Sequence, residues 1–190
     1  AIVAGKVVMA GGAWTGELLP ALSQVLAIER RVLHWFADPG GVHSLSAGFK
    51  PFIADAADGQ EFYGFPAIDT TGVKAAEHDL RAALHAPVAS ADGLDRHVRA
   101  EEVERIRDIV RQRLPALKGP IASKVCMYPM SKDGHFIVDR LPSSERVIVC
   151  AGLSGHGFKF ATALGEALAA LALDRRPPVD IDFLSLSRFA

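Results

Sequence analysis

Short runs of apolar residues, broken by turn-forming residues, dominate the first half of the chain and predict strands. Strand-like runs cover residues 31–36, 49–54 and 61–68, and clusters of Asp, Pro, Thr and Gly separate them. These features indicate an antiparallel sheet in which consecutive strands are neighbours. Residues 100–114 follow a different pattern, because Val103, Ile106, Val110 and Leu114 recur at helical spacing and predict an amphipathic helix.

Two segments at opposite ends of the chain share the order strand, glycine turn, helix. Residues 6–10 are followed by Gly11-Gly12 and a helix-prone stretch to Leu22, and residues 146–151 by a glycine-rich turn and a helix to Leu173. The fold class we expect is therefore mixed α/β (α+β). We expect residues 27–132 to form one sheet domain, with residues 1–26 and 133–190 as two pieces of a second domain.

Composition narrows the classes of partner. The 190 residues are 49% hydrophobic and 23% charged, which is typical of globular proteins. The 21 Lys and Arg residues balance 22 Asp and Glu residues, so we expect neither nucleic acid nor a membrane surface as a partner. No apolar run approaches the roughly 20 residues that span a bilayer. Two cysteines suit a reducing, cytoplasmic compartment. Because the chain begins with Ala1 and carries no signal-peptide pattern, we expect a fragment.

The glycine-rich turn at residues 152–157 is the strongest candidate site. A strand that ends in glycines allows a ligand to approach the backbone, and the N-terminus of the next helix offers free N–H groups to an electron-rich ligand. Tight packing of the turn is an equally good explanation of the glycines. The turn does not match GxGxxG, and Ser154 does not lie in a GxSxG elbow, so serine hydrolase chemistry is not expected.

Further candidates are a cation, an imidazole and a thiol. Lys74 and His78 are four residues apart and share one face of a strand or a helix, where they could line a site or simply face solvent. Cys126 could be a nucleophile, an attachment point or a buried apolar residue, whereas the apolar run around Cys150 favours burial. The histidines and cysteines lack metal-binding spacings, so we expect no metal.

The ordered set of motifs resembles the monomeric sarcosine oxidase and N-methyltryptophan oxidase family of FAD-dependent amine oxidases, in the D-amino-acid oxidase superfamily. The motifs cover essentially the whole chain: Gly11-Gly12-Ala13-Trp14, Tyr63-Gly64-Phe65-Pro66, Gly72-Val73-Lys74 with His78, Cys126-Met127-Tyr128, Asp133-Gly134-His135-Phe136, Ser154 to Phe160, and Phe183 to Phe189. Pro129 and Gly134 depart from the family pattern, which has a hydroxyl residue and an acidic residue there.

The resemblance implies an incomplete enzyme. Members of this family are about twice as long, and the chain looks like their C-terminal half, without the N-terminal GxGxxG unit and its arginines. It implies part of a Rossmann-like FAD-binding domain, residues 1–26 and 133–190, and an antiparallel-sheet substrate domain, residues 27–132. The missing N-terminal half is thus an expected partner, beside a small amine substrate and O2.

The resemblance also assigns roles to residues. Cys126 matches the cysteine that bonds covalently to the flavin, and Lys74 matches the lysine that activates oxygen. His78, Tyr63 and Tyr128 match residues around the substrate amine. Lys159 matches the lysine that holds the substrate carboxylate. The implied contacts with FAD come from the glycine turn: Gly152, Ser154, Gly155, His156, Gly157, Phe158 and Lys159.

The implied reaction is oxidation of a secondary amine such as sarcosine or another N-methyl amino acid. A hydride passes to flavin N5, O2 is reduced to hydrogen peroxide, and water hydrolyses the imine. Alternative substrates are N-methyltryptophan, a fructosyl amino acid and pipecolate. Two other classes remain open: a flavin-free fragment that only binds a partner, and a cysteine hydrolase that uses Cys126 with His135.

Overall fold

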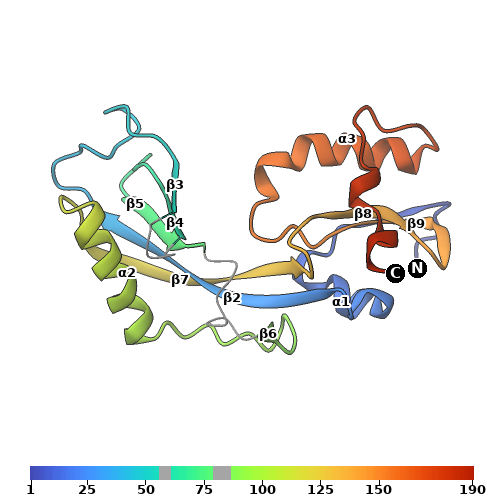
Figure 1. Ribbon diagram of the computed structural model, residues 1–190, viewed down its shortest axis with the longest axis horizontal. Helices are drawn as coiled ribbons and strands as arrows, with labels where there is room; N and C mark the ends of the chain where they lie inside the picture. Colours follow the sequence, from blue (N-terminus) through green and yellow to red (C-terminus); the bar gives the residue numbers. More distant parts are fainter. Residues whose placement is uncertain (56–60, 79–86) are drawn as a thin grey trace. The chain divides into compact units, whose positions relative to one another are not determined.

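Two compact units make up the chain (Figure 1). The computed structural model describes residues 1–55, 61–78 and 87–190. Unit 1 comprises residues 1–29, 86–94 and 127–190, and unit 2 comprises residues 30–85 and 95–126. Residues 87–94, which we expected in the central sheet domain, thus belong to unit 1. Hydrogen bonds explain the difference, because Trp14 Nε1 donates to Asp92 over 2.9 Å and the N–H of Ala91 donates to Glu17 over 3.1 Å.

The sheet of unit 1 joins the two ends of the chain. Strands β1 (Val7–Met9), β9 (Ser144–Ala151) and β8 (Ile137–Leu141) lie in the order β1-β9-β8. Strand β1 runs parallel to β9, and β8 and β9 form an antiparallel pair. Because β1 and β9 are parallel neighbours, the glycine turns that follow them leave the same end of the sheet.

Helix α3 (Ala161–Ala172) covers the core of unit 1. Its buried Leu164 and Leu168 pack with residues of β8, β9 and the C-terminal segment: Phe136, Val138, Ile148, Cys150 and Leu184. The helix that we expected to reach Leu22 is instead three short pieces, η1 (Gly12–Trp14), α1 (Thr15–Leu18) and η2 (Pro20–Leu22). Proline explains the break, because Pro20 has no N–H to continue a helical ladder. The C-terminal segment forms η4 (Asp182–Leu184) and η5 (Leu186–Phe189).

Unit 2 is built on antiparallel strands. Strands β3 (Phe52–Asp55), β4 (Glu61–Phe65) and β5 (Val73–Glu77) follow one another as neighbours. Strand β2 (Leu26–Ala37) then pairs with β5, with β6 (Pro87–Val88) and with β7 (Lys118–Ser131). The sheet is therefore not the simple meander that we expected, because β2 lies beside β5 rather than beside β3. Strands β2 and β7 each contribute residues to both units.

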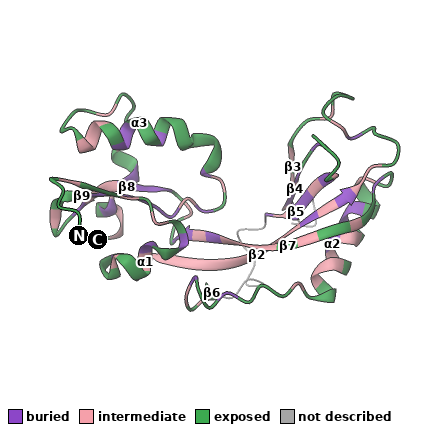
Figure 2. Cartoon of the chain, turned by 180° about the vertical axis from the view of Figure 1, so that it is seen from behind, coloured by how far each residue is buried: buried purple, intermediate pink, exposed green. Residues whose placement is uncertain are grey.

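Helix α2 (Ala100–Arg113) packs on one face of these strands. Its buried Ile106, Ile109 and Val110 meet apolar residues of the sheet: Phe36, Phe62, Val73 and Ala75, with Leu117. Figure 2 shows buried residues on the strands beside α2. The alternation of side chains along β4 and β5 therefore directs one set of residues towards α2 and the other set away from it. Among the helices of the described residues, none combines the length and apolar character needed to cross a membrane.

Candidate functional site

The face of unit 2 opposite α2 carries the side chains that the sequence singled out on β4 and β5. Phe65 lies directly opposite Lys74 across the two strands, and Tyr63 lies opposite Ala76. Since side chains alternate, Lys74 shares this face with Tyr63 and Phe65, and His78 continues it just beyond the end of β5.

Aromatic rings surround the Lys74 ammonium. Its Nζ lies 5.7 Å from the ring centroid of Tyr63 and 5.4 Å from that of Phe65. The two rings meet edge to face, with centroids 5.9 Å apart and planes at 87°. The Tyr63 ring also meets the His78 ring edge to face at 5.7 Å. Ring faces attract a cation, so Tyr63 and Phe65 hold Lys74 in place.

Cys126 lies within the electrostatic reach of two cations. Burial raises the pKa of the Cys126 thiol, and the charges of Lys74 and Arg31 oppose that increase. Burial likewise lowers the pKa of Lys74. Arg31 is only 2% exposed, so its charge acts on Cys126 from within unit 2. Nothing in the sequence pattern singles out Arg31, because an arginine in a strand is usually exposed.

In unit 1 the turn between β9 and α3 has an unusual backbone. Gly152, Ser154 and Gly155 have φ values of 58°, 47° and 77°, so a non-glycine residue adopts the left-handed conformation between two glycines. A Cβ atom at Gly155 would lie 2.2 Å from the ring of Tyr128, and one at Gly157 would lie 2.5 Å from the side chain of Leu153. Close packing therefore accounts for the glycines at positions 155 and 157.

The same turn also presents hydrogen-bond donors. The N–H groups of Phe158 and Lys159, at the start of the helical segment, have no acceptor among the described residues, and both side chains are exposed. His156 donates its Nδ1 proton to the carbonyl of Ser154 over 2.9 Å, since a carbonyl oxygen can only accept, and its ring lies 4.7 Å from that of Phe136. Lys159 Nζ lies 5.4 Å from the Phe160 ring. These donors suit an electron-rich ligand.

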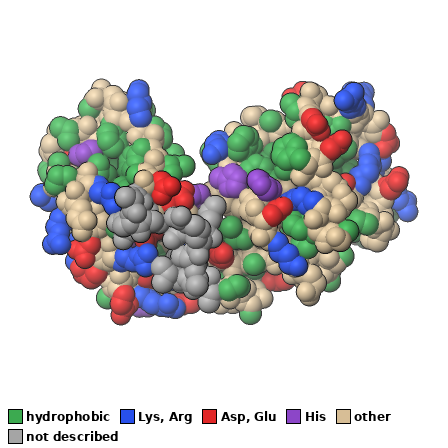
Figure 3. Space-filling view, in the orientation of Figure 1, with side chains coloured by type: hydrophobic (Ala, Val, Ile, Leu, Met, Phe, Trp, Pro, Cys, Tyr) green, Lys and Arg blue, Asp and Glu red, His purple; other side chains and the backbone are tan. Residues whose placement is uncertain are grey.

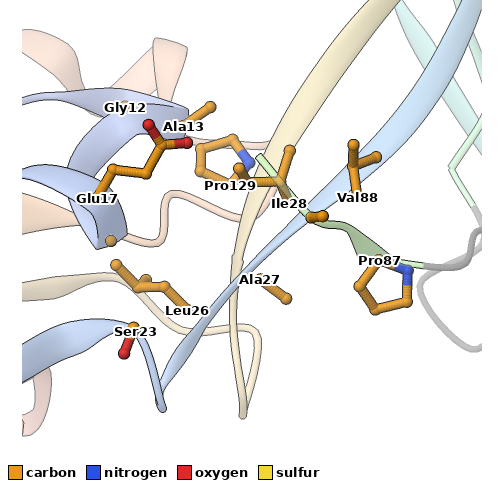
Figure 4. A pocket seen from close by; sticks show the side chains of 12 residues that line it. Gly12, Ala13, Glu17, Ser23, Leu26, Ala27, Ile28, Pro87, Val88 and Pro129 are labelled. Atoms are coloured by element: carbon orange, nitrogen blue, oxygen red, sulfur yellow. The ribbon is translucent and has the colours of Figure 1, made fainter. Parts of the chain in front are cut away.

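A cavity of about 240 Å³ lies beside the first glycine turn of unit 1. Gly12, Ala13 and Glu17 line it from one side together with Pro129, and residues of β2 and β6 complete it (Figure 4). The carbonyl of Pro129 accepts the N–H of Ser154 over 2.9 Å, which ties this wall to the turn at residues 152–157. The sequence pattern gave no sign of Glu17, because a single acidic residue in a short helix is typical of a solvent-facing position.

The predicted site residues thus fall into two groups. Unit 2 brings together Tyr63, Lys74 and His78, with Cys126 in electrostatic contact with Lys74. Unit 1 brings the ring of Tyr128 against the second glycine turn. That turn carries the other candidates: Gly152, Ser154, Gly155, His156, Gly157, Phe158 and Lys159.

The two departures from the expected motif have different structural settings. Gly134 has a φ of 75°, and its N–H donates to the carbonyl of Ser131 over 3.2 Å. A tight turn with a left-handed residue explains the glycine at that position. Pro129 lies on the cavity wall at a point where its carbonyl, and not an N–H, makes the contact with the turn.

Charges on the visible surface are mixed. On the face drawn in Figure 3, Lys and Arg side chains are interspersed with Asp and Glu, in agreement with the net charge of −1. Within the described ranges, no group of three or more His, Cys, Asp or Glu side chains could hold a metal ion. The raised pKa of Cys126 disfavours the thiolate that a cysteine hydrolase needs.

Comparison with known proteins finds a family that covers most of the chain. A family model described as FAD dependent oxidoreductase matches residues 1–171. N-methyl-L-tryptophan oxidases of Yersinia pestis (strain Pestoides F) and Yersinia pseudotuberculosis serotype O:1b are each 39% identical over 186 residues, which is 98% of this chain and 48% of theirs. The chain therefore spans about half the length of the curated relatives it matches.

Solved structures support the fold. Iminodiacetate oxidase from Chelativorans sp. BNC1 has a TM-score of 0.75 at 17% identity, over 97% of this chain and 46% of that one. Glycine oxidase from Geobacillus kaustophilus has a TM-score of 0.72 at 19% identity, over 98% of this chain and 46% of that one. The mixed α/β fold class expected from the sequence is confirmed.

Proposed function

The chain belongs to the family of FAD dependent oxidoreductases, and from this premise we propose that it forms part of an oxidase of N-methyl amino acids. The observation that carries the proposal is the arrangement of unit 2, in which the Lys74 ammonium lies against the rings of Tyr63 and Phe65 and interacts electrostatically with the Cys126 thiol. A fixed cation beside a thiol and aromatic rings suits redox chemistry on an aromatic cofactor better than hydrolysis.

The residues present fit FAD. The free N–H groups of Phe158 and Lys159 are donors for the electron-rich edge of a flavin, and the positive end of α3 favours negative charge there. When bound, FAD supplies the chemistry, accepting a hydride from the carbon attached to the amine nitrogen and passing the electrons to O2 to give hydrogen peroxide, while water hydrolyses the imine.

Residues of unit 2 would act on oxygen and on the amine. Lys74 keeps a positive charge in a fixed place, and such a charge stabilises negative charge as it develops on oxygen. Tyr63 and His78 lie beside one another on the same face and would line the amine site. Cys126 would be the point of covalent attachment, and the charges of Lys74 and Arg31 partly oppose the rise in its pKa that burial causes.

Residues of unit 1 would bind and orient. Lys159 is exposed and free to reach a substrate carboxylate as a point charge. The ring of Tyr128 packs against Gly155 within unit 1, and we propose Tyr128 as a further residue that contacts the amine. His156 is oriented by its hydrogen bond to Ser154, which leaves its Nε2 available to a ligand.

The substrate we favour is an N-methyl amino acid, either N-methyl-L-tryptophan or sarcosine. The relatives named N-methyl-L-tryptophan oxidase support this class through 39% identity over nearly the whole chain. A fructosyl amino acid or pipecolate is the second possibility within the family. The structural likeness to a fructosamine oxidase, at 18% identity, supports the fold and not a substrate.

A second polypeptide segment would complete the enzyme. Strand β1 lies at the edge of its sheet, and its consecutive residues Val7 and Val8 are 46% and 43% exposed although they point to opposite faces. We propose the N-terminal half of the enzyme as the partner that covers this edge.

The cysteines Cys126 and Cys150 are both free, which supports a reducing, cytoplasmic location.

The test is to assay an intact enzyme that contains this chain. We expect visible flavin absorbance, and anaerobic bleaching of that absorbance by N-methyl-L-tryptophan or sarcosine, followed by hydrogen peroxide release when air is admitted. Acid precipitation should leave flavin on the Cys126 peptide and not on the Cys150 peptide. A colourless protein, or one that is not bleached by any secondary amine, would contradict the proposal.

A further inference from the structure

The left-handed backbone of Ser154 is held from inside unit 1. Ser154 is fully buried, and its hydroxyl donates to the carbonyl of Gly152 over 2.9 Å and accepts the N–H of Ser131 over 3.2 Å. A non-glycine residue at a φ of 47° is costly unless its surroundings hold it there. The hydroxyl of Ser154 and the end of β7 therefore set the shape of the turn at residues 152–157.

Ser131 is in turn fixed by the segment that follows it. Its hydroxyl lies 2.6 Å from the carbonyl of His135 and 3.1 Å from Asp133 Oδ1, so it can donate to either. Asp133 also accepts the N–H of His135 over 3.1 Å. Residues 131–135 thus form one hydrogen-bonded loop whose inner end touches Ser154.

A C-terminal arginine holds the outer end of this loop. Arg188 Nε donates to Asp133 Oδ2 over 2.7 Å, and its Nη2 lies within 3.0 Å of the carbonyls of His135 and Phe136. Its Nη1 donates to the carbonyl of Ser185 over 2.9 Å. The Arg188 hydrogen bond holds the pKa of Asp133 well below its usual range, so the pair stays charged at neutral pH.

We infer that Arg188 is a positioning residue, which fixes the glycine turn at residues 152–157 through Asp133 and Ser131 and so orients the candidate flavin-binding donors that follow the turn. The path consists of hydrogen bonds within unit 1 and involves no group of unit 2. The part of the inference that concerns flavin rests on the proposed function, whereas the link from Arg188 to the turn does not.

Arg140 provides a matched control. It lies in the same unit, its side chain is 24% exposed against 19% for Arg188, and it also clamps separate elements. It donates to the carbonyls of Glu145 and Leu171 over 2.8 and 2.7 Å and to Asp174 over 3.0 Å. None of these acceptors contacts Ser131 or Ser154 in the described hydrogen bonds. Arg140 therefore resembles Arg188 in burial and in making several hydrogen bonds to separate elements, but these hydrogen bonds do not connect it to the turn.

The first experiment measures hydrogen exchange in the holoenzyme. The N–H groups of Ser154 and His156 are protected by the carbonyls of Pro129 and Leu153. We expect R188Q to speed their exchange by about ten- to a hundredfold, the loss that follows from a charge-assisted hydrogen bond, and R140Q to change it less than about threefold. Equal effects of the two variants, or none in R188Q, would overturn the inference.

A double-variant comparison tests whether the effect of Arg188 on the turn passes through Ser131 or reflects a general loss of stability in unit 1. S131A removes the hydroxyl that joins the 131–135 loop while leaving the contacts of Arg188 intact. If the effect passes through Ser131, R188Q adds little exchange in the S131A background, whereas independent effects multiply. Multiplying effects would contradict the inference. Should R188Q fail to fold, R188K, which keeps the charge but not the planar fork, takes its place with a smaller expected increase.

The flavin provides a second readout that does not depend on turnover. We expect R188Q to shift the visible absorption bands and lower the midpoint potential of the bound flavin, and R140Q to leave both unchanged. A spectrum and potential unchanged in R188Q would contradict the orientation of flavin-binding donors. A wild-type protein without flavin would refute the proposed function, while the exchange experiment would still decide whether Arg188 positions the turn.

Discussion

The two candidate regions differ in what they use for binding. In unit 2 the site consists of side chains on regular strands, where Tyr63, Phe65 and Lys74 meet on one face through ordinary alternation. In unit 1 the site consists of backbone in a turn, where left-handed residues and a buried network set the positions of N–H groups.

The difference determines which substitutions are tolerated. A strand face accepts many residues without a change of backbone, so substitutions there change chemistry first. The turn has little freedom, because Gly155 packs directly on the ring of Tyr128, so substitutions there change structure first. Variants of the strand face should therefore lose activity first, whereas variants of the turn should lose stability first.

The largest effect should come from Lys74. In an intact enzyme, Lys74→Met removes the fixed positive charge, and we expect flavin reoxidation by O2 to slow by about 100- to 1,000-fold while anaerobic reduction by substrate changes less. Lys159→Met should instead weaken substrate binding and leave reoxidation nearly unchanged. Stopped-flow measurement of each half-reaction separates the two lysines, and a failure of both variants in the same step would contradict the division of roles.

Gly155→Ala tests the rigidity of the turn. The new Cβ meets the Tyr128 ring at 2.2 Å with φ at 77°, so we expect a loss of about 2–4 kcal/mol in the free energy of unfolding. Gly165→Ala is the control, because Gly165 lies in α3 with nothing within 4 Å, and alanine there should stabilise by up to about 1 kcal/mol. Urea unfolding measures both, and equal stability of the two variants would show that the turn is not rigid.

The strand at residues 61–68 and the shared face of Lys74 and His78 could be predicted because their signals are local. The position of Tyr63 beside them depends on the pairing of β4 with β5, which the sequence pattern does not specify. The pairing of β2 with β5 was missed, since residues 38–51 between β2 and β3 carry no pattern that specifies a distant partner. The broken first helix could have been read from Pro20.

The sequence was less informative about unit 1. It located the glycine turn but could not decide between packing and binding, and the structure supports packing at positions 155 and 157 together with free donors at 158 and 159. The network of hydrogen bonds in unit 1 links Arg188 to Ser131 through Asp133, and Ser131 and Arg188 are 57 residues apart in the sequence. No local pattern in a single sequence encodes such contacts, and the same holds for the buried Arg31.

As pH decreases, unit 2 should begin to lose stability at a higher pH than unit 1. Burial lowers the pKa of His34 from 6.5 to about 4, although the charge of Glu102 opposes the shift. Between these two pH values His34 is protonated in the unfolded chain and neutral in the folded chain. Stability then falls as pH decreases from about 6.5 to about 4, by about 2–3 kcal/mol in total, and levels off below.

Asp133 in unit 1 also loses its contribution as pH falls, but over a lower pH range than His34. Its pKa is lowered from 3.8 by Arg188, so its contribution is complete above about pH 4 and is lost only at lower pH. Hydrogen exchange of each unit at pH 7, 5 and 3.5 checks this order. His34→Gln, which can still hydrogen bond to Ser123 Oγ, should abolish the loss between pH 6.5 and 4. Persistence of the loss in that variant would assign it to another group.

The smallest effect concerns the ring beside Lys74. Phe65→Leu removes a ring face 5.4 Å from Nζ, and since such a contact is worth about 0.5–1 kcal/mol for a charged ammonium, the pKa of Lys74 should fall by about half a unit. The pH above which reoxidation slows should decrease by the same amount, because the charged form then persists over a narrower range. Phe65→Tyr keeps a ring in place and should leave the profile unchanged. If Phe65→Leu and Phe65→Tyr give the same profile as the wild type, the aromatic ring does not tune the charge of Lys74, and the unit 2 face acts through Lys74 alone.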